Sequence, residues 1–185
     1  MADTGYISPG TMADDSAVGS RTWSNPDNAK ANDGSYASTS SYGGEYTHYL
    51  KATNFGFSIP AGATVDGIKV EIEKMAWYFD RDHASDNIVS IVKADGSIGS
   101  TNKSVGATWS TTETYYEYGG SSDLWGETWT PTNINDVDFG VVLSAYIVSY
   151  SDIDVDHIRI KVYYTVASAT IQGISTIQGI QSITL

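Results

Sequence analysis

A group of aromatic residues between positions 109 and 129 carries the side chains best suited to binding chemistry in this sequence. Flat aromatic faces stack on sugar rings, and the neighbouring carboxylates of Glu117, Asp123 and Glu127 could accept hydrogen bonds from sugar hydroxyls. The alternative is that these rings cover the end of a hydrophobic core, and the spread of the five Trp along the chain favours this alternative. The candidate sugar-binding residues are Trp109, Tyr116, Tyr118, Trp125 and Trp129.

Residues that could form a metal centre or a catalytic site are scattered along the chain. His48, His83 and His157 lie far apart and lack the spacing of metal ligands. The acidic segment from Asp80 to Asp86 lacks the glycine and the distal glutamate of an EF-hand, so we interpret it as a solvated loop. The sequence contains no nucleophile-elbow, Walker or zinc motif. We therefore expect no catalytic residues, no metal, no cofactor and no enzymatic activity.

The last sixteen residues form a repeat, TIQGIS-TIQGIQ-SITL, in which isoleucine recurs at every third position. Burying an apolar side chain of this size is worth roughly 1.5–3 kcal/mol, so we expect something outside the domain to bury this tail. Identical tails meeting around a three-fold axis would give each chain one inward residue in three. The alternatives are a tail docked singly into a neighbouring protein and a final strand on its own sheet. The residues expected to mediate assembly are Ile171, Gly173, Ile174, Ile177, Gly179, Ile180, Ile183 and Leu185.

The composition predicts an all-β protein. The 185 residues suffice for one good-sized domain with extensions. Only 17% of the residues are charged, and 13 Tyr, 5 Trp and 18 Gly give a balance that is poor for helices. The net charge of −12 without a basic cluster argues against nucleic-acid binding. No apolar run reaches the ~18 residues of a membrane span, and the absence of Cys excludes disulfides.

Alternation with a period of two marks the strands most clearly in residues 67–73, 139–147 and 158–164. About nine such strands without intervening long helices predict a single antiparallel β-sandwich that is jelly-roll-like. Thr130 and Pro131 have the residue types of an N-cap and a first helical position, which predicts one helical turn there. We divide the chain into three parts: an extended N-terminal arm (1–17), a β-sandwich domain (18–166) and an isoleucine-repeat C-terminal tail (167–185).

The apolar phase of the last strand slips by one residue near Asp156 and His157. Aspartates occupy the even positions of 152–156, whereas the even positions are apolar from Ile158 onward. A slip of this kind predicts a β-bulge or a strand boundary. The three aspartates would line one strand face, where a cation would relieve their repulsion if several subunits met there.

Five segments of the chain are distinctive enough to compare with known families. They are 52–74 (ATNFGFSIPAGATVDGIKVEIEK), 123–131 (DLWGETWTP), 133–135 (NIN), 139–143 (FGVVL) and 155–165 (VDHIRIKVYYT). Together they resemble segments that recur in a family of tailed-phage proteins with an all-β domain, and the resemblance covers residues 15–165. It implies a structural protein of the phage virion. Tails with Ile-Gln-Gly repeats are likewise similar to the ends of some virion proteins.

We therefore expect a non-enzymatic virion structural protein that assembles through its termini, as a capsid decoration protein, a head fibre or a tail component. Its expected partners are copies of itself, as a trimer at the tail, and other virion proteins of the capsid or tail. The N-terminus lacks the basic and apolar regions of a signal peptide, so we expect synthesis in the host cytoplasm before incorporation into the virion. The alternative is a carbohydrate-binding or adhesin β-sandwich module that uses the aromatic group to bind host-surface glycans.

Overall fold

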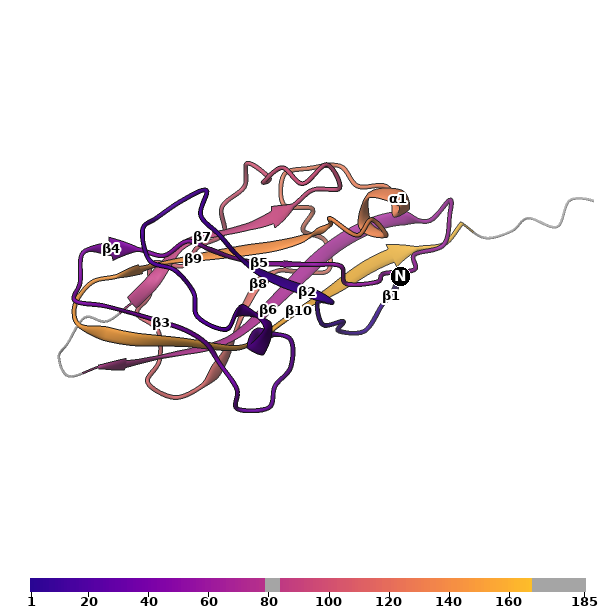
Figure 1. Cartoon of the computed structure of the whole chain (residues 1–185). Coiled ribbons are helices and arrows are strands. Elements are labelled where there is room, and N and C mark those ends of the chain that lie inside the picture. Colours follow the sequence, from indigo (N-terminus) through magenta and orange to yellow (C-terminus); the bar gives the residue numbers. More distant parts are fainter. Residues whose placement is uncertain (79–83, 168–185) are drawn as a thin grey trace, which may run out of the picture.

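Two antiparallel β-sheets pack face to face in the computed structural model (Figure 1), which describes residues 1–78 and 84–167. The first sheet contains β1 (Ala2–Asp3), β3 (Ala37–Ser41), β6 (Thr64–Tyr78), β8 (Thr114–Gly119) and β10 (Ser151–Thr165). The second contains β2 (Thr11–Asp15), β4 (Glu45–Tyr46), β5 (Tyr49–Thr53), β7 (Ala84–Val92) and β9 (Gly140–Ile147). From β6 onward each strand lies in the opposite sheet from the strand before it, as in a jelly roll. The predicted all-β sandwich is confirmed.

The order of the strands makes β10 and β9 the central strands of their sheets. In the first sheet β10 pairs with β6 on one side and with β1 and β3 on the other, and β8 pairs with β6. In the second sheet β9 pairs with β4, β5 and β7, and β2 pairs with β5. Residues 1–17, which we expected to form a separate arm, thus supply one strand to each sheet.

The core lies between the two sheets and contains the inward rows that the alternation predicts. Ile68, Val70 and Ile72 of β6 are completely buried, and so are the inward residues of β9 and β10. The opposite row of β6 faces away from the core, yet its residues Glu71 and Glu73 are only 4% and 8% exposed. The side chains of Tyr6 and Arg159 contact Glu71, and that of Asn32 contacts Glu73, so this part of the outer face is a packed polar layer.

The helices are short. They are η1, a 3₁₀ turn at Pro26–Ala29, and α1, a single α-helical turn at Pro131–Ile134. Thr130 caps α1 as predicted, since its Oγ1 accepts a hydrogen bond from the backbone N–H of Asn133 at 3.2 Å. In the described part of the chain, no helix has the length and apolar character needed to cross a membrane.

The predicted bulge in β10 is confirmed. The register between β10 and β6 shifts between Val155 and His157. Up to Asp154 the even residues of β10 point outward, and from His157 onward the odd residues do. The bulge therefore places aspartates on the outer face at one end of the sheet and basic side chains on the same face further along.

Candidate functional site

The predicted sugar-binding aromatics do not form a common surface. Trp109, Tyr118 and Trp125 are only 2%, 3% and 1% exposed and belong to the main core cluster. Tyr116 and Trp129 are half-buried and pack against the same cluster. Since three of the five rings are enclosed between the sheets, they cannot stack on a ligand. Their alternative role, packing in the core, is the one that the structure shows.

Trp77, near the end of β6, is the most exposed of the five tryptophans, with 55% of its surface accessible. Its neighbour Ala76 points into the core, so the alternation of the strand directs the indole outward. On the outer face Trp77 lies opposite Asp152 of β10, which in turn lies opposite Ser40 of β3. The register of three strands thus aligns an aromatic ring, a carboxylate and a hydroxyl in one row.

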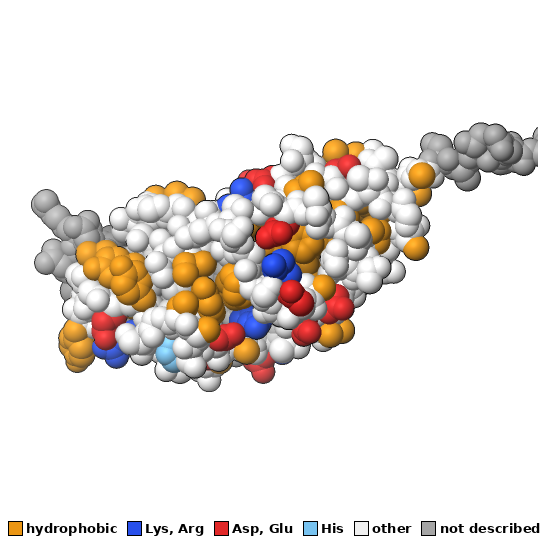
Figure 2. Space-filling view, turned by 90° about the horizontal axis from the view of Figure 1, so that it is seen from above, with side chains coloured by type: hydrophobic (Ala, Val, Ile, Leu, Met, Phe, Trp, Pro, Cys, Tyr) orange, Lys and Arg blue, Asp and Glu red, His pale blue; other side chains and the backbone are white. Residues whose placement is uncertain are grey.

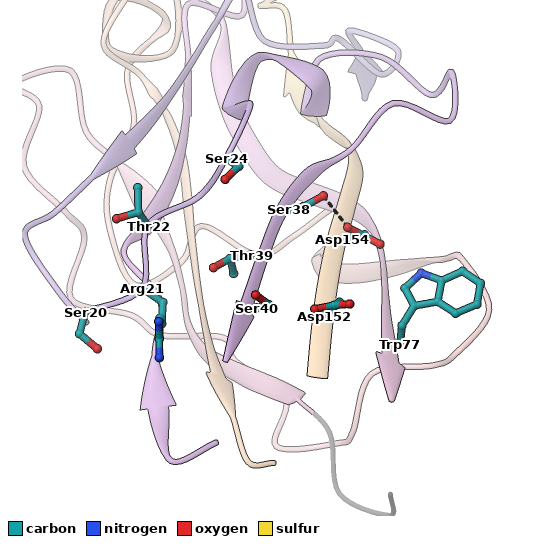
Figure 3. A pocket seen from close by; sticks show the side chains of 10 residues that line it. All are labelled: Ser20, Arg21, Thr22, Ser24, Ser38, Thr39, Ser40, Trp77, Asp152 and Asp154. Carbon is teal, nitrogen blue, oxygen red and sulfur yellow. Dashed lines mark hydrogen bonds between the residues drawn. The ribbon is translucent and has the colours of Figure 1, made fainter. Parts of the chain in front are cut away.

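A groove with a volume of about 600 Å³ contains this row. Figure 3 shows residues 20–24 along one side of it, Trp77 on the other side, and β3 and β10 between them. Its lining is dominated by hydroxyl groups, each of which can donate and accept hydrogen bonds. The lining residues are Ser20, Arg21, Thr22, Ser24, Ser38, Thr39, Ser40, Trp77, Asp152 and Asp154.

Asp154 is the more enclosed of the two carboxylates in the groove. Its Oδ1 accepts a hydrogen bond from Ser38 Oγ at 2.5 Å. Burial raises the pKa of Asp154, hydrogen bonds with Ser38 and Trp77 oppose the rise, and the charge of Asp152 adds to it. Asp152 is exposed and offers its carboxylate to the groove.

Arg21 lies at the rim of the groove and is already engaged by a carboxylate. Its Nε donates to Glu45 Oε2 at 2.6 Å, and its guanidinium forms an ion pair with the same oxygen. Hydrogen bonds from Ser41 and Arg21 lower the pKa of Glu45. With Arg21 neutralised in this way, the groove has an acidic character that suits uncharged polyhydroxyl ligands better than anions.

A smaller depression of about 360 Å³ includes Trp129. The Trp129 ring packs edge-on against Phe139 with 5.4 Å between ring centroids, and its Nε1 donates to the carbonyl oxygen of Leu124 at 2.9 Å. Much of this ring is therefore used for packing, unlike the ring of Trp77. The lining residues are Lys93, Ala94, Asp95, Glu127, Thr128, Trp129 and Asn133.

Three carboxylates that the sequence did not associate meet on the outer face of the first sheet. Oxygen atoms of Glu73, Glu113 and Asp156 lie within 4.8 Å of one another. Burial, followed by the neighbouring Asp156, raises the pKa of Glu113 to about 7. Backbone amides of Asp33 and Gly34 donate to the Asp156 carboxylate at 3.4 and 3.3 Å. Protonation of Glu113 is one way to relieve the repulsion in this cluster, and the expectation of no metal stays a prediction.

The two histidines within the described residues, His48 and His157, do not share a site. His48 contacts Asp14 with 2.8 Å between Nδ1 and Oδ2, whereas His157 lies on β10 in the other sheet. His83 and the predicted assembly tail, whose residues fall within 168–185, lie outside the described residues. Assembly through the tail therefore stays a prediction.

Comparisons with known proteins found little. No family model matches the chain, and no curated protein matches it. Among solved structures, the chain is similar to "BiXyn10A CBM1 APO" with a TM-score of 0.38 and 8% identity, over 89% of this chain and 92% of that one. It is also similar to the CBM22-1 xylan-binding domain of Paenibacillus barcinonensis Xyn10C, with a TM-score of 0.36 and 9% identity, over 85% and 92% of the two chains. Scores this low carry no argument about function.

Proposed function

We propose that this chain is a non-catalytic carbohydrate-binding β-sandwich and that the groove beside Trp77 is its binding site. The observation that carries the proposal is the row formed by Trp77, Asp152 and Ser40, in which an exposed aromatic face adjoins hydrogen-bonding groups. A sugar ring has an apolar face and a rim of hydroxyls. The indole can cover the face while the carboxylate and the hydroxyl bond to the rim.

The charge distribution supports a neutral glycan over a nucleic acid or an acidic polymer. The chain has a net charge of −12. On the face shown in Figure 2, the few Lys and Arg side chains lie beside Asp and Glu rather than gathering into a basic patch. A phosphate or uronate backbone would meet the carboxylates of Asp152 and Asp154 at the groove and would be repelled.

The placement of the two groove carboxylates supports binding rather than hydrolysis. Glycoside hydrolysis requires two carboxyl groups that flank the bond to be broken. Asp152 and Asp154 instead project from the same face of one strand. They would therefore contact a bound chain from one side.

Native electrophoresis through gels that contain soluble polysaccharides tests the proposal. We expect a neutral polysaccharide such as a xylan, a β-glucan or a galactomannan to retard the protein, and a polyuronate such as pectin to leave its mobility unchanged. Incubation with the retarding polysaccharide should produce no new reducing ends. The binding proposal fails if none of the neutral polysaccharides retards the protein, and new reducing ends would refute its non-catalytic part.

A structural role in a phage virion is the earlier expectation from the sequence, and it stays a prediction. It depends on the resemblance of residues 15–165 and on the repeat tail. The two functions are compatible, because a virion protein that binds host-surface glycans would use such a groove. Jelly rolls occur both in viral capsids and in lectins, so the fold itself does not discriminate between them.

A further inference from the structure

Lys74 is a charged residue enclosed in the middle of the sandwich. It follows Ile68, Val70 and Ile72 in the inward row of β6 and is 0% exposed. Its Nζ lies over three aromatic rings at centroid distances of 4.4 Å (Trp109), 4.5 Å (Tyr116) and 5.3 Å (Tyr118). A lysine in an enclosed aromatic site is costly unless its charge is paired or lost.

Asp86 of β7 meets Lys74 from the opposite sheet. A register shift in the pairing of β7 with β9 follows immediately after Asp86, which is 7% exposed. Oδ1 of Asp86 accepts hydrogen bonds from Lys74 Nζ and from Trp109 Nε1, the latter at 2.9 Å. Oδ2 accepts hydrogen bonds from Tyr118 Oη at 2.8 Å and from the backbone N–H of Val105 at 3.2 Å. The amine and the carboxyl group are thus held in contact with fixed orientations.

Tyr118 closes a cycle between the two groups. Its Oη accepts a hydrogen bond from Lys74 Nζ at 2.6 Å and donates one to Asp86 Oδ2. A proton that leaves Lys74 Nζ can therefore be relayed by the Tyr118 hydroxyl to Oδ2 of Asp86. Burial also lowers the pKa of Lys74 to about 8, which makes the neutral, nucleophilic amine accessible near neutral pH.

We propose that Lys74 and Asp86 condense spontaneously into an intramolecular isopeptide bond that links the two sheets covalently. First, the Lys74 ammonium passes one proton to Oδ2 of the Asp86 carboxylate, which gives a neutral amine and a neutral carboxylic acid. The nitrogen lone pair then attacks Cγ. A second proton moves from the nitrogen through Tyr118 to Oδ2, and the bond from Cγ to Oδ2 breaks to release water. One C–N bond has replaced one C–O bond, with no oxidant or reductant.

The surrounding groups match the needs of this reaction. The indole N–H of Trp109 points at Oδ1, the oxygen that carries negative charge in the tetrahedral intermediate, and can stabilise it as an oxyanion hole does. Contact between nucleophile and electrophile removes the entropic cost of bringing them together. The site is buried from solvent, which strengthens these electrostatic effects and favours loss of water.

The bond would have a consequence for the groove. It would close a covalent ring around residues 75–85, and this segment includes Trp77. In a chain without cysteines, such a ring would restrain the end of β6 in the way that a disulfide restrains a loop. The inference does not depend on the proposed glycan binding.

Mass spectrometry of the denatured full-length protein tests the proposal. We expect the wild type to be lighter than its sequence by one water, and a protease digest to contain a branched peptide that joins Lys74 to Asp86. The digest separates this loss from removal of Met1. Lys74→Ala and Asp86→Ala should have their full sequence masses, and Asp86→Asn should lose ammonia instead of water.

Tyr118→Phe tests the relay separately. We expect the water loss to form about a hundredfold more slowly in this variant, in line with the loss of one general acid–base group. The wild type alone decides the main claim, whether or not any variant folds. If wild-type protein incubated at neutral pH keeps its full sequence mass and yields no branched peptide, Lys74 and Asp86 form only a buried ion pair and the proposal is wrong.

Discussion

Replacing Trp77 with Ala should weaken glycan binding and leave the fold intact. Burial of a tryptophan covers about 150–250 Å². With 55% of Trp77 exposed, about 100 Å² is available to a ligand. At about 25 cal/mol per Å², covering this area contributes about 2.5 kcal/mol. The expected loss is therefore roughly sixty-fold in Kd.

Isothermal titration with an oligosaccharide from the retarding polysaccharide measures this loss. Trp77→Phe is the matched control, because it keeps an aromatic face, and we expect it to lose less than about fivefold in affinity. Trp129→Phe changes the ring in the smaller depression and should leave Kd unchanged. The exposed position of Trp77 predicts a change in unfolding free energy within about 0.5 kcal/mol for Trp77→Ala. If this folded variant binds as tightly as the wild type, the groove is not the binding site.

Three further predictions concern stability and assembly. The pKa of Glu113 is raised from 4.5 to about 7, so the folded state binds more protons than the unfolded state in this window and stability falls as pH rises through it. Glu113→Gln should therefore raise the free energy of unfolding at pH 8 by on the order of 1 kcal/mol, which thermal melts would show as a higher melting temperature, and should change it little at pH 4. An equal effect at both pH values would contradict this. Trp23→Ala should cost about 3–5 kcal/mol in urea unfolding, since Trp23 is 2% exposed in the core, and a loss under about 1 kcal/mol would show that its site is not rigidly packed. Truncation after Val166 should reduce the oligomeric state seen by light scattering; an unchanged state would refute assembly through the tail.

The fold could be predicted from the sequence because its determinants are local. Alternation at Ile68, Val70 and Ile72 fixes which face of β6 is buried, and the same reasoning located the bulge next to His157. The cap at Thr130 depends on only four consecutive residues. Each of these features can be read within one strand or turn.

The candidate site could not be predicted in this way because it depends on pairing between distant strands. Trp77 gains its role from Asp152 and Ser40, and only the register of β3, β10 and β6 brings the three together. The group between 109 and 129 was misleading for the opposite reason. Its rings are close in sequence, but Trp109 and Trp125 pack into the core. The one local signal for the buried network was Lys74, which interrupts the apolar row of β6.

Glycan binding in the groove is tested most directly by nuclear magnetic resonance of the five tryptophan indole N–H groups during titration with the bound oligosaccharide. Four of these groups, those of Trp23, Trp109, Trp125 and Trp129, donate to protein oxygens outside the groove lining, whereas the Trp77 side chain hydrogen-bonds with Asp154 in the groove. The account predicts that the Trp77 indole signal shifts progressively to saturation, together with the backbone amides of Ser38–Ser40 and Asp152, while the other four indole signals stay in place. A saturating shift at Trp129, with Trp77 unchanged, would contradict it.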